Sequence, residues 1–123
     1  MTRTESPYHR PIEYALLIYL PPDAWEQLSE QEREALYEEF WAIRDLAGFI
    51  DGAQLAPAHT ATTVRLDDGQ SLVTDGPFAD TKEVFGGYYL FEADDLDAAV
   101  QIATRIPAAR IGGSVEIRPV LHR

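Results

Sequence analysis

The most constraining feature of this sequence is the segment 12–20, which is apolar at nearly every position. A strand with one face in water alternates apolar and polar residues, whereas a strand covered on both faces is apolar throughout. Pro21 and Pro22 end the segment, because proline cannot donate to a sheet ladder. A second segment, 84–93, is similarly rich in Tyr and Phe. The sequence therefore predicts two strands that are covered on both faces of their sheet.

The segment after the first strand carries a helix signal. Ser29 and Glu32 match a capping box, in which each side chain satisfies a free amide at the start of a helix. Apolar residues then recur at spacings of four, three and four, at Leu36, Phe40, Ile43 and Ala47. The pattern predicts an amphipathic helix over about residues 30–47, ended by Gly48.

The middle of the chain predicts further strands. Residues 49–55 are expected to form one strand, ended by Pro57. Two short runs follow, 61–66 and 70–74, and Asp-Gly at 68–69 between them supplies the positive φ of a tight turn. The two runs are therefore expected to form a hairpin.

The last part of the chain predicts a second helix and a final strand. Asp94 and Asp95 cap a helix in which apolar residues recur up to Ile106, and Pro107 ends it. Residues 115–120 form the last strand. The whole order is β-α-β, an inserted hairpin, then β-α-β. This order predicts an α+β fold of the ferredoxin-like split β-α-β kind, with one antiparallel sheet and both helices on one face.

Such a fold leaves one face of the sheet bare. The segments 12–20 and 84–93 supply apolar residues to that face, which would form a larger exposed patch than a monomer usually carries. A second copy is the simplest cover, so we expect a homodimer with its sheets packed face to face. The alternative is that loops cover the face.

Composition narrows the function classes. The chain has 123 residues and no cysteine, which excludes disulfides, thiolate catalysis and cysteine-ligated metals. Its formal charge of −11 repels phosphate backbones and anionic lipids, so neither nucleic acid nor membrane is expected as a partner. The acidity suits solubility, with docking to a basic partner as the alternative.

We expect a cytoplasmic protein with a flexible tail over residues 1–11 and a single domain over 12–123.

The residues 73–83, Val-Thr-Asp-Gly-Pro-Phe-Ala-Asp-Thr-Lys-Glu, followed by Gly-Gly-Tyr-Tyr at 86–89, resemble the signature of the DGPF branch of the YCII-related family. The segments 61–65, 94–99 and 114–120 are also similar to that family, and the resemblance covers about residues 12–120. It implies a ferredoxin-like subunit in a dimeric α+β barrel. Some members are encoded beside extracytoplasmic-function sigma factors, and a few relatives are enzymes acting on aromatic or lactone-like small molecules. Smaller YCII-related proteins have a His–Asp pair with the histidine early in the first long helix, where this chain has none.

Three residues around the signature are candidates for chemistry. Asp75 lies at a loop mouth before Gly76 and is the candidate general base, although its carboxylate can instead fix the turn as an Asx turn. Lys82, the only lysine, can hold a substrate carboxylate, pair with Asp75 or stay solvated. His59 can be brought toward Asp75 by its loop to rebuild a His–Asp pair, or it is an exposed imidazole.

Tyr14 and Tyr88 are weaker candidates for substrate binding. Their hydroxyls can line a pocket between helix and sheet, whereas the apolar pattern favours the core or a dimer interface. The three histidines have no metal-binding spacing, and no nucleotide-binding motif occurs, so no metal and no cofactor are expected.

Two functions remain. The absence of a complete catalytic constellation favours a binding protein, which takes a small molecule or serves as the sigma-factor-associated regulatory module that the resemblance implies. The alternative is a cofactor-independent lyase, isomerase or dehydrochlorinase-like enzyme for a small cyclic or aromatic compound. In that enzyme Asp75 is the base, and Lys82 or His59 steadies the developing anion.

Overall fold

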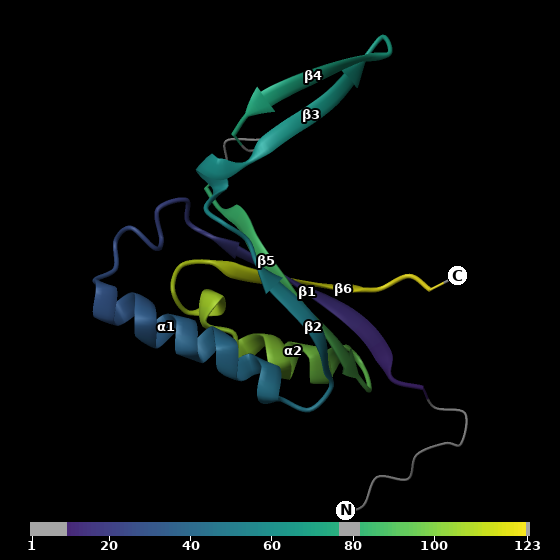
Figure 1. The fold of residues 1–123 in the computed structure, drawn as a ribbon. Coiled ribbons are helices and arrows are strands. Elements are labelled where there is room, and N and C mark those ends of the chain that lie inside the picture. The colour runs from purple at the N-terminus through teal and green to yellow at the C-terminus, as the bar shows by residue number, and fades with distance from the viewer. Residues whose placement is uncertain (1–9, 77–81, 123) are drawn as a thin grey trace, which may run out of the picture.

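The computed structural model describes residues 10–76 and 82–122 (Figure 1). The predicted tail over residues 1–11 lies almost wholly outside the described residues, as do residues 77–81 of the signature. The strands and helices, in chain order, are β1 (Ile12–Leu20), α1 (Glu30–Ala42), β2 (Phe49–Gln54), β3 (Thr62–Asp67), β4 (Gln70–Asp75), β5 (Val84–Ala93), α2 (Leu96–Thr104) and β6 (Ser114–Pro119).

Four strands form the main sheet in the order β2-β5-β1-β6, and every neighbouring pair is antiparallel. Both helices lie on the same side of this sheet (Figure 1). The chain thus crosses from β1 through α1 to β2, and from β5 through α2 to β6. The predicted α+β, ferredoxin-like fold is confirmed.

The two faces of β1 differ as its sequence predicts. Every second residue, at Tyr14, Leu16, Ile18 and Leu20, is buried against the helices. The residues between them point to the other side of the sheet, away from both α1 and α2 (Figure 1). We call this side the helix-free face. Its apolar centre consists of Ala15, Leu17 and Tyr19 from β1 and their cross-strand partners Leu90, Tyr88 and Phe85 from β5.

The capping box of α1 is confirmed. The Glu32 amide donates to Ser29 Oγ and the Ser29 amide donates to Glu32 Oε1, both at 3.1 Å. The α-helix is shorter than predicted, because it ends at Ala42 and tightens into a 3-10 turn, Ile43–Asp45. Ile43, the first residue of that turn, is buried in the core.

Gly48 then turns the chain into β2. It has φ +90, and a Cβ there would lie 2.2 Å from the Glu92 carbonyl oxygen. The Glu92 amide donates to the Gly48 carbonyl at 2.7 Å, which fixes this close approach. Glycine is therefore required here both for its left-handed backbone and for the absence of a side chain.

The second helix also begins as predicted, since the Ala98 amide donates to the Asp95 carboxylate at 2.9 Å. It ends at Thr104, two residues before the predicted boundary, and Ile106 reaches the core from the following segment. Phe91 and Leu16 form the centre of that core and are fully buried. Among the described residues, no helix is long and apolar enough to cross a membrane.

The strands β3 and β4 form a separate two-stranded sheet. Asp68 and Gly69 both have positive φ, 49 and 78, which confirms the predicted tight turn. The hairpin projects away from the body of the domain and from both helices (Figure 1).

Candidate functional site

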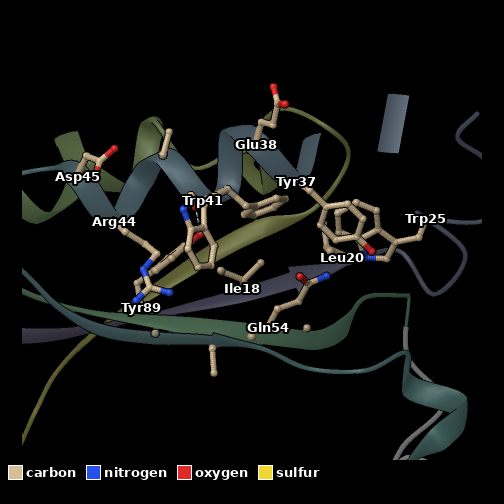
Figure 2. Close-up of a pocket in the computed structure, with 16 residues that line it drawn as sticks. Ile18, Leu20, Trp25, Tyr37, Glu38, Trp41, Arg44, Asp45, Gln54 and Tyr89 are labelled. Atoms are coloured by element: carbon tan, nitrogen blue, oxygen red, sulfur yellow. Dashed lines mark hydrogen bonds between the residues drawn. The ribbon is translucent and has the colours of Figure 1, made fainter. Parts of the chain in front are cut away.

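A cavity of about 500 Å³ lies between α1 and the sheet (Figure 2). Its floor is the helix side of β1, β2 and β5, and its roof is α1 with the 3-10 turn that follows. Three glycines belong to this floor, Gly52, Gly86 and Gly87. At Gly52 and Gly87 a Cβ would lie less than 3 Å from neighbouring atoms, so these two positions of the floor require glycine.

Gly52 also makes room for one wall of the cavity. A Cβ on Gly52 would lie 2.8 Å from Tyr89 Cδ1 and 2.9 Å from the Tyr88 carbonyl oxygen. Contacts this short do not occur between real atoms, so the Tyr89 ring occupies its place because residue 52 has no side chain. The cross-strand pair Gly52 and Tyr89 thus shapes the cavity from two strands far apart in sequence.

Aromatic side chains form the walls. Trp25, on the segment between β1 and α1, stacks on Tyr37 of α1 with ring centroids 4.7 Å apart and planes 10° apart. Trp41 stands at the other end of the cavity beside Arg44 and Tyr89 (Figure 2). Its side chain is 68% exposed, which is unusual for so large an apolar group. Flat aromatic surfaces of this kind suit a planar ligand.

Arg44 supplies a cation at the same end. Its guanidinium carbon lies 4.4 Å from the Trp41 ring centroid and 5.4 Å from that of Phe49. Within the described ranges, no carboxylate forms an ion pair with Arg44. A guanidinium stacked on rings keeps its N–H edge free to bind a carboxylate. Glu38, which also borders the cavity, points its carboxylate away from the sheet (Figure 2).

Tyr89 has a structural role. Its hydroxyl donates to the Phe40 carbonyl oxygen at 2.6 Å. Burial raises the pKa of Tyr89 to about 12, against a smaller lowering effect of Arg44. The phenol therefore keeps its proton at neutral pH and holds the end of α1 on the sheet, rather than acting as a base.

A second hollow of about 580 Å³ adjoins the first. Both are bordered by Trp25, Tyr37 and Gln54. The stacked pair of Trp25 and Tyr37 therefore stands between the two hollows as a shared wall.

The five residues singled out in the sequence lie elsewhere, and none of them borders either hollow. Asp75 is exposed at the end of β4, where it pairs with Thr62 of β3. His59 is exposed in a 3-10 turn, and Lys82 is exposed before β5. Their catalytic and binding roles stay predictions.

The two tyrosines differ from each other in position. Tyr14 is 3% exposed in the core on the helix side of β1. Tyr88 is half-buried on the helix-free face, opposite Leu17. Tyr14 is therefore in the core, as the apolar pattern favours, and an interface position for Tyr88 stays a prediction.

Sequence reasoning missed the cavity residues Trp41, Arg44 and Trp25. A signal existed for two of them, because Tyr37, Trp41 and Arg44 follow one another at spacings of four and three and so share one side of the helix. Trp25 has no such signal, since it lies outside any periodic segment. In the part of the chain that the structure describes, no three His, Asp or Glu side chains gather as a metal site.

Two comparisons with known proteins bear on this site. The family model described as the YCII-related domain matches residues 12–122. A protein of Rhizobium meliloti (strain 1021), itself described as uncharacterized, is 35% identical over 112 residues, which cover 87% of this chain and 90% of that protein. The match spans both the cavity and the hairpin. The narrower assignment to the DGPF branch stays a prediction.

Proposed function

The chain belongs to the YCII-related family, and on this premise we propose that it is a small-molecule-binding subunit of a homodimer. Its ligand is a planar organic acid bound in the cavity between α1 and the sheet. The observation that carries the proposal is Arg44, a cation stacked on Trp41 at the end of an aromatic cavity.

The size and lining of the cavity support a ligand of this class. Its volume of about 500 Å³ falls within the usual range for small-molecule sites. Such sites combine apolar walls with a few polar groups that fix orientation, here Arg44 at one end and the amide of Gln54 on the sheet side (Figure 2). A carboxylate facing Arg44 forms a charge-assisted hydrogen bond, the stronger kind.

Binding without chemistry suits the groups that line the cavity. Its titratable side chains are Tyr37, Glu38, Arg44, Asp45 and Tyr89. Tyr89 is already bonded to the helix, and Glu38 points away from the cavity. A general base needs to lie within hydrogen-bond reach of the proton that it removes. The cavity therefore supports recognition better than proton transfer.

Calorimetric titration with 2-naphthoate tests the proposal, and the neutral 2-naphthamide serves as the matched ligand. We expect 2-naphthoate to bind more tightly, and Arg44→Gln to weaken its binding by at least about tenfold, as expected for loss of a hydrogen bond to a charged group. Arg105→Gln removes the same charge at the exposed end of α2 and is the control variant. Equal binding by all three proteins would contradict the proposal.

The homodimer rests on the helix-free face. Its apolar centre is ringed by charged side chains, at Glu13, Asp51, Glu92, Glu116 and Arg118. An apolar patch with a polar rim is typical of an interaction site. We expect light scattering at micromolar concentration to give twice the subunit mass of 13.8 kDa.

The link to an extracytoplasmic-function sigma factor stays a prediction that comes from the resemblance of the signature. Co-purification of a sigma factor with the chain from its own cells would support it. The enzymatic alternative, with Asp75 as base, is tested by a turnover screen of the wild type and Asp75→Asn. This alternative predicts that the activity of the wild type is lost in Asp75→Asn.

A further inference from the structure

Among the described residues, the β3–β4 hairpin pairs with no other strand. Its two strands pair with each other and with no strand of the main sheet. An isolated two-stranded hairpin is marginally stable in water, and such a hairpin is stable when something packs on it. The hairpin therefore needs a cover that the rest of the described chain does not supply.

One side of the hairpin carries an apolar surface. Val64 of β3 lies directly opposite Val73 of β4, and Leu66 is two residues along from Val64 on the same side. These three side chains are 61%, 65% and 75% exposed, respectively. The other side presents mainly polar groups, with Leu72 opposite Arg65 as its large apolar residue. We call the Val64, Leu66 and Val73 surface the arm face.

Hydrogen bonds between its two strands close the base of the hairpin. The Gly76 amide donates to the Ala61 carbonyl at 2.7 Å, and Thr63 Oγ1 donates to the Gly76 carbonyl at 2.8 Å. From this base the hairpin projects away from α1 and α2 (Figure 1). A subunit packed on the helix-free face also lies on the side away from the helices, and so beside the hairpin.

Interface size also favours a second copy. Four strands about 4.8 Å apart and about six residues long have a footprint of roughly 400 Å². A stable interface usually takes about 800 Å² of accessible surface from each partner. Side-chain relief raises the accessible area of the sheet above its footprint, but the sheet alone stays at the low end. Two further strands in each subunit enlarge the interface considerably.

We propose that the β3–β4 hairpin is an arm that clasps a second copy of this chain through Val64, Leu66 and Val73. The proposal rests on the homodimer proposed above. Because a twofold dimer repeats every contact, each subunit both extends its arm and receives the arm of its partner.

A matched pair of substitutions within the hairpin tests this proposal. Leu66→Gln changes the arm face, and Leu72→Gln makes the same change on the opposite face. The dimer dissociation constant is measured by sedimentation for the wild type and both variants. We expect Leu66→Gln to raise the dimer dissociation constant by at least about tenfold for each arm, which is about a hundredfold if the two arms of the dimer act independently. Leu72→Gln should raise the constant by less than about threefold.

The outcomes separate the arm from the dimer. A monomeric wild type at micromolar concentration would overturn both proposals. A dimeric wild type whose dissociation constant responds equally to Leu66→Gln and Leu72→Gln would overturn the arm and leave the dimer standing. Leu17→Glu, in the helix-free face, is expected to dissociate the dimer whether or not the arm exists.

Cross-linking tests the arm without relying on a destabilised variant. Since the chain has no cysteine, Leu66→Cys gives one attachment site for a maleimide benzophenone. This benzophenone-labelled protein, at natural isotope abundance, is mixed with ¹⁵N-enriched protein that carries no benzophenone, and the mixture is illuminated. We expect cross-linked peptides that combine the two isotopes. Cross-links confined to one isotope in a dimeric sample would overturn the arm.

Discussion

The main sheet and the β3–β4 hairpin are both built from antiparallel strands whose successive side chains point to opposite faces, yet their burial differs. On β1 every second residue is less than a tenth exposed, whereas Val64, Leu66 and Val73 of the hairpin are each more than half exposed. The difference shows that alternation specifies which side chains share a face, while burial depends on what is packed against that face. For the main sheet the cover is two helices of the same chain. For the hairpin we infer that it is a second chain.

The largest effect is expected at the centre of the body. Phe91→Ala should lower the free energy of unfolding by about 3–5 kcal/mol, because the side chain is fully buried and its loss opens a cavity in the core. Leu72→Ala, on the face of the hairpin opposite the arm face, should cost less than about 0.5 kcal/mol. Urea denaturation of both variants at one protein concentration checks the contrast. Equal costs would mean that the hairpin is as firmly packed as the core.

Gly48 in the body of the domain and Gly69 in the hairpin provide a second comparison of the two regions. Gly48 and Gly69 both have positive φ, so alanine is strained at each. At Gly48 the new Cβ also meets the Glu92 carbonyl, whereas at Gly69 it meets open space. We expect Gly48→Ala to cost about 3 kcal/mol and Gly69→Ala about 1 kcal/mol in the same denaturation assay. A larger cost at Gly69 would place the turn of the hairpin in a tightly packed environment.

Tyr89 should have an intermediate effect that depends on pH. Tyr89→Phe removes the hydrogen bond to Phe40 and should cost about 1 kcal/mol at neutral pH. Burial raises the pKa of Tyr89 to about 12, above its unfolded value of 10.0, so its contribution is complete below pH 10 and is lost as the pH rises toward 12. Stability curves of the two proteins should therefore converge over that range. Tyr37→Phe, whose side chain is exposed, is the control.

Asp75 should have the smallest effect. Its side chain is exposed on β4, so Asp75→Ala should change the free energy of unfolding by less than about 0.5 kcal/mol. A loss of about 1 kcal/mol would indicate that the carboxylate fixes the turn before Pro77. A clear gain would indicate a carboxylate held at a cost to stability, as catalytic groups often are, and would return Asp75 to the enzymatic alternative.

Local signals in the sequence predicted local structure well. The capping box at Ser29 and the Asp68-Gly69 turn each depend on a few neighbouring residues, and both formed as expected. The end of α1 was predicted only in part, because Ile43 is buried as its spacing from Leu36 predicts but the α-helix already ends at Ala42 and continues as a 3-10 turn. Periodicity indicates which residues share a face, and it does not distinguish the last turn of an α-helix from a 3-10 turn.

The cavity could not be predicted for a related reason. It exists where Gly52 and Tyr89 meet across two strands, and where Trp25 folds back onto Tyr37. Each of these pairings depends on the sheet register or on a non-helical connection. The sequence pattern indicated that glycines bend strands and that aromatic residues fill cores, but it did not indicate that these particular residues leave a space between them.

If the cavity between α1 and the sheet binds a planar acid, as we propose, the tryptophans that line it should respond to the ligand. The chain has two, Trp25 and Trp41, and they stand at opposite ends of the cavity. Their indole N–H resonances, assigned with a Trp41→Phe variant, can be followed by NMR during titration with 2-naphthoate. We predict saturable shifts in both, and loss of saturation in Arg44→Gln. Unmoved indole resonances at millimolar 2-naphthoate, or identical shifts in Arg44→Gln, would contradict the claim.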